Sequence, residues 1–180
     1  PIRCKEIVVY PQQAQMRAVP SPAHLEALSW CERLIRPRDL GILYVSRARF
    51  AECRDQKSLL GGYAGERLLE SMLETRDVTV IHPEELSLSE QLEFYRGAKA
   101  IIIAEGSAQH GLELLGFHSD KSLIVICRRR QIKGMELPLR ARFPNVQFIE
   151  AITNQWQAID GVPWDGLAFL DWPVVVNAIN

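Results

Sequence analysis

Short apolar runs alternate with helical patterns along most of this chain, and this alternation restricts the fold more than any other feature. Apolar residues recur at helical spacing between the runs, as Leu25, Leu28 and Cys31 do. Strands separated by helices of this length form βαβ units around a parallel sheet. We therefore predict a doubly wound, Rossmann-like α/β fold with helices on both faces of the sheet. The predicted strands are Ile7–Tyr10, Gly41–Ser46, Val78–His82, Ala100–Ala104, Ser122–Cys127 and Val146–Glu150.

Local signals mark where the helices begin and where the main domain ends. Ser21 is a good N-cap before a proline at the first helical position, and Ser87 with Glu90 fits a capping box. A helix over residues 107–115 is predicted to take Ser107 as its N-cap. We place the Rossmann-like domain at residues 1–153. We expect residues 154–180, rich in Trp and Pro, to form a tail that packs on it and buries its aromatic side chains.

Composition narrows the class of protein. The chain has 180 residues, 47% of them hydrophobic and 24% charged, which is typical of a soluble globular protein. A net charge of −1 argues against a nucleic-acid partner, and no apolar stretch approaches the roughly 20 residues of a membrane span. Four scattered cysteines form no C-x-x-C pair, so we expect reduced thiols and a cytoplasmic location.

Polar residues gather where the predicted strands end. The most informative segment is Lys99–His110, in which an apolar run breaks into Glu105, Gly106 and Ser107. In an open parallel sheet ligands bind at the carboxyl edge, where helix N–H groups suit a phosphate or a sugar oxygen. The same edge collects further groups that suit an anionic ligand, namely Ser46, Arg47, Arg49, His82, Glu84, Glu85, His110 and the run 128–130 of three arginines.

The absence of several well-known motifs argues against the enzyme classes that carry them. The chain has neither G-x-G-x-x-G after the first strand nor a P-loop, which argues against a dehydrogenase and a P-loop NTPase. The four histidines show no metal-ligand spacing, so no metal is expected. Around Ser107 the chain lacks the second glycine of the nucleophile elbow, which argues against a serine hydrolase that uses Ser107 with His110.

Residues 40–130 resemble glycosyltransferase family 61. The resemblance rests on the run Leu43–Arg47, the pair Gly65-Glu66, the segment Val80–Gln91 with Pro83-Glu84-Glu85-Leu-Ser, and the run Ala98–His110. The family shows a strand ending in I-S-R, an N-E pair, a P-E-x-L-S-x-x-E-Q segment and a strand running into H-G-A-G-L-T-N. This chain has Gly65 in place of the asparagine, Glu105 in place of the histidine and His110 in place of the threonine. The variant is similar to a bacterial branch that serves capsule or lipopolysaccharide assembly.

The resemblance implies a nucleotide-sugar donor, a glycan acceptor and a metal-independent, two-domain GT-B architecture. This chain would then supply the C-terminal donor-binding half, with an N-terminal domain or a partner chain completing the enzyme. We take Glu105 and His110 as candidate catalytic groups. The candidate donor-binding residues are Arg47, Arg49, Glu66, Glu84, Gly106 and Ser107. A binding module that kept the fold without turnover is the alternative.

Overall fold

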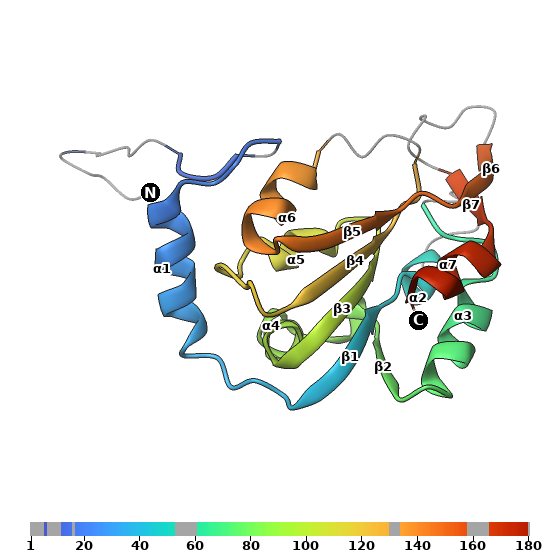
Figure 1. The fold of residues 1–180 in the computed structure, drawn as a ribbon, viewed down its shortest axis with the longest axis horizontal. Helices are drawn as coiled ribbons and strands as arrows, with labels where there is room; N and C mark the ends of the chain where they lie inside the picture. The colour runs from blue at the N-terminus through green and yellow to red at the C-terminus, as the bar shows by residue number, and fades with distance from the viewer. Residues whose placement is uncertain are drawn as a thin grey trace.

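The computed structural model describes residues 6, 12–15, 17–52, 61–129, 134–157 and 166–179. Its centre is a sheet of five parallel strands in the order β2-β1-β3-β4-β5 (Figure 1). Each strand coincides with an apolar run of the sequence, so five of the predicted strands are confirmed. The sixth, Ile7–Tyr10, lies outside the described residues. The bounds are Leu40–Val45 for β1, Val78–Ile81 for β2, Ala98–Ala104 for β3, Ser122–Ile126 for β4 and Asn145–Ile149 for β5.

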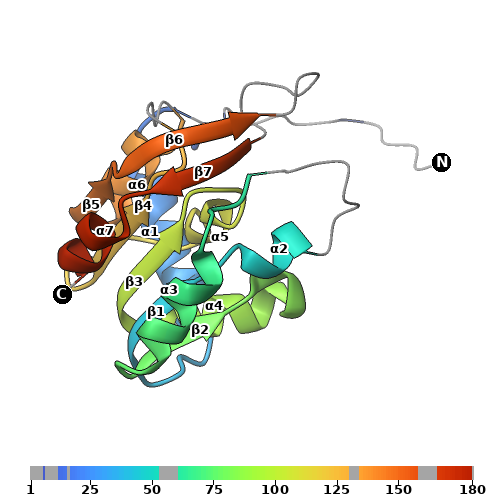
Figure 2. The same cartoon turned by 90° about the vertical axis from the view of Figure 1, so that its right-hand side faces the viewer.

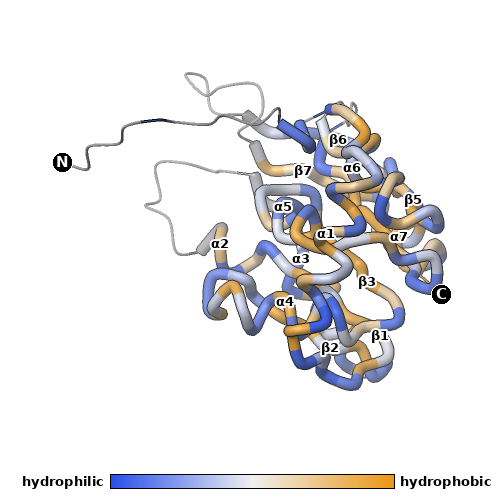
Figure 3. The backbone as a smooth tube through the Cα atoms, turned by 90° about the vertical axis from the view of Figure 1, so that its left-hand side faces the viewer, coloured by the Kyte–Doolittle hydropathy of each residue, from blue (hydrophilic) through white to orange (hydrophobic). Residues whose placement is uncertain are grey.

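Strand β3 is apolar on both sides because it is covered on both sides. Ile101 and Ile103 belong to one buried cluster and Ile102 belongs to another, and all three are at most 1% exposed. Alternate residues of a strand point to opposite faces, so the continuous run fills two cores at once. Figure 3 shows the hydrophobic colour gathered on the strands between the helices.

Helices cover the two faces of the sheet. On one face lie α4 (Leu88–Gly97), α5 (Gln109–Leu112) and α6 (Glu136–Arg142), whose apolar residues join the cluster around Ile101. On the other face α3 (Glu66–Glu74) and α7 (Trp172–Ile179) join the cluster around Ile102 (Figure 2). The doubly wound, Rossmann-like α/β fold is therefore confirmed. None of the helices in the described ranges is long and apolar enough to cross a membrane.

Two helix starts follow the sequence signals, and a third does not. Ser21 accepts a hydrogen bond from the His24 N–H at the start of α1 (Pro22–Glu32), and Ser87 forms the capping box with Glu90. The prediction of a helix over residues 107–115 with Ser107 as its N-cap was wrong, since α5 has four residues and Ala108 occupies the N-cap position. Around this short helix several N–H groups bond to the carbonyl three residues earlier, as from His110 to Ser107 at 3.0 Å, which is the pattern of 3-10 turns at helix ends.

The chain after β5 forms a hairpin and a helix. Strands β6 (Ile152–Gln157) and β7 (Gly166–Leu170) pair antiparallel and lead into α7. Trp172 packs against the core and donates from Nε1 to the Ala64 carbonyl at 3.1 Å. Trp156 is 63% exposed, so the expectation that the aromatic residues here are buried was wrong for this one, because its strand belongs to a separate two-stranded sheet. Trp164 lies outside the described residues.

The order of the strands in the sheet indicates where a ligand would bind in a fold of this kind. Strand β1 lies between β2 and β3, and the chain leaves β1 toward one edge of the sheet and later returns toward the other. Crossovers on opposite faces leave a crevice at the carboxyl ends of the strands where the order reverses. The segments that follow β1, β2 and β3 meet at this crevice. They are α2 (Ala48–Glu52), the short 3-10 helix η1 (Pro83–Glu85), and the turn before α5.

Candidate functional site

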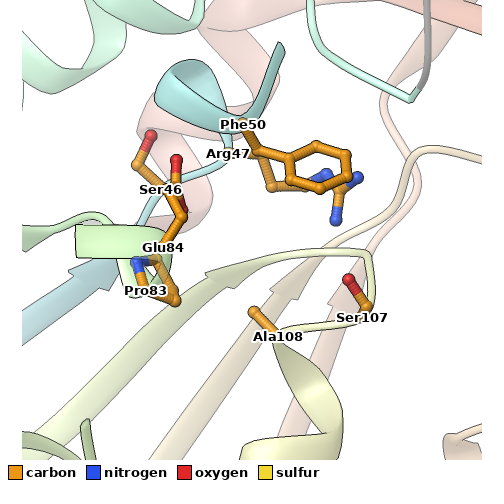
Figure 4. A pocket seen from close by; sticks show the side chains of 7 residues that line it. All are labelled: Ser46, Arg47, Phe50, Pro83, Glu84, Ser107 and Ala108. Carbon is orange, nitrogen blue, oxygen red and sulfur yellow. The ribbon is translucent and has the colours of Figure 1, made fainter. Parts of the chain in front are cut away.

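A pocket of about 240 Å³ opens at this crevice (Figure 4). Three segments line it, each from the carboxyl end of a different strand: the start of α2 after β1, the start of η1 after β2, and the turn after β3. The lining residues are Ser46, Arg47, Phe50, Pro83, Glu84, Ser107 and Ala108. The predicted position of the site at the carboxyl edge of the sheet therefore agrees with the place of the pocket.

Arg47 is the cationic wall of the pocket. Its side chain is largely buried, and its Nε donates to the Gly61 carbonyl at 2.9 Å. Its guanidinium also lies 4.8 Å from the centre of the Phe50 ring, in a cation–π contact. A Cβ at residue 106 would lie 1.5 Å from one terminal nitrogen of Arg47, so the guanidinium crosses the backbone where Gly106 leaves room. Glycine permits this close approach because it has no side chain.

A second guanidinium lies beside the first. A Cβ built on Gly61 would meet the Arg128 Cζ at 3.0 Å and an Arg47 terminal nitrogen at 3.2 Å, so both side chains converge on one point. Arg128 is 6% exposed, and the pKa of its guanidinium is lowered by burial and then by the charge of Arg47. The charge of Glu105 acts on Arg128 in the opposite direction, and two neighbouring guanidinium groups can also attract an anion from solution. Planar guanidinium groups suit phosphate oxygens in particular.

Glu66 fixes the backbone that carries Arg47. Its Oε1 accepts from the Arg47 N–H at 2.7 Å, the Tyr44 hydroxyl at 2.9 Å and the Ser46 hydroxyl at 3.1 Å. Among the described residues, Oε2 of this carboxyl has no hydrogen-bond partner. Burial raises the pKa of Glu66, although the three hydrogen bonds act in the opposite direction. The carboxyl therefore belongs to the framework behind the pocket.

The same framework extends to the far side of the pocket. The Ser46 hydroxyl also contacts Glu70 Oε1, and the other oxygen of Glu70 pairs with Arg67 at 2.8 Å. His82, directly before the η1 turn, has its Nδ1 at 3.8 Å from Glu70 Oε1. Buried side chains of α3 thus connect the end of β1 to the end of β2.

Glu105 is a second buried anchor. Its Oε2 accepts from the backbone N–H groups of Arg128 and Arg129 at 2.7 and 3.1 Å, and its Oε1 accepts from Arg129 Nε at 2.7 Å. Its own N–H donates to the Tyr63 hydroxyl at 2.9 Å, which in turn donates to the Ile126 carbonyl at 2.6 Å. Glu105 is 2% exposed with both oxygens occupied, so it holds the chain after β4 in place.

The structure brings together some of the residues predicted from the sequence and separates others. Arg47, Glu84 and Ser107 line the pocket, with Gly106 directly beneath Arg47. Arg49 instead forms an exposed ion pair with Glu85 at 2.8 Å.

Neither candidate catalytic residue is among the described residues that line the pocket. Glu105 is buried beneath it, and His110 is exposed with its Nδ1 at 2.5 Å from Glu113 Oε1. Within the described ranges no hydrogen bond joins the Ser107 hydroxyl to the His110 ring, as a serine hydrolase would use; the ring contacts Glu113 instead. Nor do three His, Cys, Asp or Glu side chains there gather as metal ligands would.

Sequence reasoning missed several residues of the site. Phe50, Pro83 and Ala108 line the pocket, and Tyr44 and Tyr63 belong to the framework. A short helix directly after a buried strand, carrying an aromatic residue three positions from Arg47, is the signal that points to Phe50. The Tyr63 hydroxyl forms hydrogen bonds with Glu105 and Ile126, which lie 42 and 63 positions further along the chain. No local sequence pattern encodes such distant contacts.

The comparisons with known proteins agree with this geometry. A family model described as Glycosyltransferase 61 matches residues 2–115. The matched region includes β1, β2 and β3 and therefore all seven residues that line the pocket. Searches of curated proteins and of solved structures returned no match.

Proposed function

Because the chain belongs to the glycosyltransferase 61 family, we propose that its pocket binds the diphosphate of a nucleotide-sugar donor, whose sugar is transferred to a glycan hydroxyl. The convergence of the Arg47 and Arg128 guanidinium groups at the carboxyl edge supports this most directly. The diphosphate leaves with an extra negative charge when the bond to the sugar breaks. Fixed cations at that position stabilise the transition state more than the ground state.

The parts of the site have separate roles in this proposal. Arg47 binds the diphosphate from the pocket lining without a metal, and Arg128 adds a second positive charge beside it. The exposed Ser107 hydroxyl hydrogen-bonds a phosphate or sugar oxygen. Glu66 and Glu105 hold the backbone of the two arginines in place. The volume of about 240 Å³ is below the roughly 300–1,000 Å³ of complete ligand pockets, so the pocket takes the sugar and diphosphate and leaves the nucleoside outside.

We also propose that the chain acts as the donor-binding half of a GT-B enzyme. The acceptor half would be an N-terminal domain or a partner chain, and the product a bacterial capsule or lipopolysaccharide. The motif Glu105-Gly-Ser-Ala-Gln-His110 supports this branch of the family. The free thiols of Cys31 and Cys127 support a cytoplasmic location.

A thermal-shift and calorimetry series with nucleoside diphosphates tests the donor site. A ligand that binds only the folded state adds about 2.7 kcal/mol of stability at a hundredfold excess over its Kd. Loss of charged hydrogen bonds in Arg47→Ala costs about 1.5–3 kcal/mol, which weakens binding roughly 10- to 100-fold. Arg49→Ala is the matched control, because that arginine pairs with Glu85 outside the pocket. Equal affinity in the two variants, or no binding by the wild type, would refute the proposal.

One observation favours the alternative of a binding module. Glu105 and His110, the candidate catalytic groups, both lie outside the pocket lining formed by the described residues. A module predicts nucleotide binding with no release of sugar from the donor. A transferase predicts that the donor is consumed when an acceptor glycan is present.

A further inference from the structure

Glu84 is the one carboxylate among the described residues that line the pocket. It lies in η1, directly after β2, and its side chain is exposed. Neighbouring glutamates are occupied, since Glu85 pairs with Arg49 and Glu90 completes the capping box of α4. Within the described part of the chain, no hydrogen bond or ion pair engages the Glu84 carboxylate, which leaves it available to a ligand.

Three further carboxylates near the crevice are buried and have structural partners. Glu66 and Glu70 lie behind Ser46, and Glu105 binds the amides that follow β4. Each of the three is at most 5% exposed. A group that takes a proton from a substrate must come within hydrogen-bond distance of it. This requirement selects Glu84 over the buried three.

Glu84 and Arg47 face the cavity from different sides. In Figure 4, Glu84 and Pro83 lie on one side, whereas the Arg47 guanidinium and the Ser107 hydroxyl lie on the other. A diphosphate bound by Arg47 would leave the space between these two sides for its sugar. A hydroxyl that reached the sugar from the side away from the diphosphate would then come to the Glu84 side of the pocket.

We propose that Glu84 is the general base of the transfer, a role that rests on the proposed function of the pocket. The Glu84 carboxylate takes the proton of the acceptor hydroxyl while the acceptor oxygen forms its bond to the anomeric carbon. The bond from that carbon to the diphosphate oxygen breaks, and its electron pair leaves with the diphosphate beside Arg47. The proton on Glu84 then passes to solvent, to which this exposed side chain is open.

Steady-state kinetics and calorimetry on the full-length protein with Glu84→Gln, Glu84→Asp and Glu85→Gln test this role. Glutamine keeps the size and polarity of the side chain but does not accept a proton. Glu84→Gln is expected to lower kcat by about 10²–10⁴-fold, the usual contribution of a general base, and to leave donor Kd and Tm unchanged. It should also remove the acidic limb of the kcat–pH profile. Glu84→Asp should recover part of the rate, and Glu85→Gln should match the wild type.

The possible outcomes separate this proposal from the proposed function. Wild-type kcat in Glu84→Gln overturns the general base and leaves the donor site intact. Weaker donor binding with unchanged kcat makes Glu84 a donor contact, which also overturns the proposal. A wild-type protein that binds the donor without turning it over is a binding module. That outcome overturns the role of Glu84, because a general base acts only where a transfer occurs. Absence of donor binding in the wild type refutes the proposed function itself.

Discussion

Replacing Gly106 by alanine is the sharpest test of how the cationic wall is built. The added Cβ would lie 1.5 Å from a terminal nitrogen of Arg47 and 2.4 Å from its Cζ. Non-bonded atoms of this kind settle at about 3.5 Å, so the guanidinium has to move by about 2 Å. N–H···O hydrogen bonds form at about 2.7–3.2 Å, so a shift of about 2 Å is several times the width of that range. The side chain would therefore lose its contacts with a bound diphosphate.

The expected loss follows from the energy of those contacts. Charged hydrogen bonds contribute about 1.5–3 kcal/mol, so Gly106→Ala should weaken nucleoside diphosphate binding roughly 10- to 100-fold. Stability should fall moderately. Among the described residues the glycines with positive φ are Gly61 and Gly65, so alanine at residue 106 meets no backbone strain. The displaced hydrogen bond from the charged Arg47 side chain to Gly61 costs about 1.5–3 kcal/mol, and the lower entropy of the unfolded alanine chain offsets part of this.

Calorimetry on Gly106→Ala, Arg47→Ala and the double variant measures the coupling. The double variant should bind no worse than Arg47→Ala alone, because without the guanidinium the Cβ has nothing to displace. Gly41→Ala is the matched control, since nothing lies within 4 Å of its added Cβ. Wild-type affinity in Gly106→Ala, or additive losses in the double variant, would refute the reasoning.

Two further predictions concern stability. Burial raises the pKa of Glu66 above its ordinary value of 4.5, so this carboxyl stabilises the fold fully below pH 4.5 and less as the pH rises through its pKa in the folded state. In urea titrations, the stability of Glu66→Gln relative to the wild type should therefore increase with pH above 4.5, and a difference independent of pH would contradict this. Gly97→Ala would place a Cβ 1.6 Å from the Arg38 backbone carbonyl oxygen, which does not swing aside as a side chain does. We expect it to lower the free energy of unfolding by about 1–3 kcal/mol, and an unchanged urea midpoint would show that the backbone yields there.

The central strands and the edge that carries the site could be predicted because they depend on local composition. The run Ala100–Ala104 has to be buried on both faces, and such a strand ends where polar residues begin. The extent of the helix after it could not be predicted, because Ser107 fits an α-helix N-cap and a tighter turn equally well. Hydrogen bonds to the carbonyl three residues earlier decided for the turn.

The role of Glu105 could not be predicted for a different reason. The same local sequence allows a glutamate at the end of a strand to face solvent, a ligand or a neighbouring backbone. Its partners, the amides of Arg128 and Arg129, lie more than twenty residues further along the chain and reach it only when β4 pairs with β3. The sequence therefore indicated that Glu105 lies at the carboxyl edge of the sheet, but it did not indicate which way its side chain points.

Glu66 and Glu105 hold the two arginines of the site in the same way. Each is buried, and each accepts the backbone N–H of an arginine that follows a neighbouring strand, Arg47 at 2.7 Å and Arg128 at 2.7 Å. A carboxylate that binds the backbone leaves the guanidinium of that arginine directed toward the ligand, and its charge still lowers the cost of burying the cation. The two guanidinium groups are thus held in place without a ligand, so little reorganisation would oppose the diphosphate binding and the transfer that we propose. The family pattern has a histidine at residue 105. The glutamate in this chain accepts from the amides after β4 and forms an ion pair with Arg129, so these contacts fix the loop that carries Arg128.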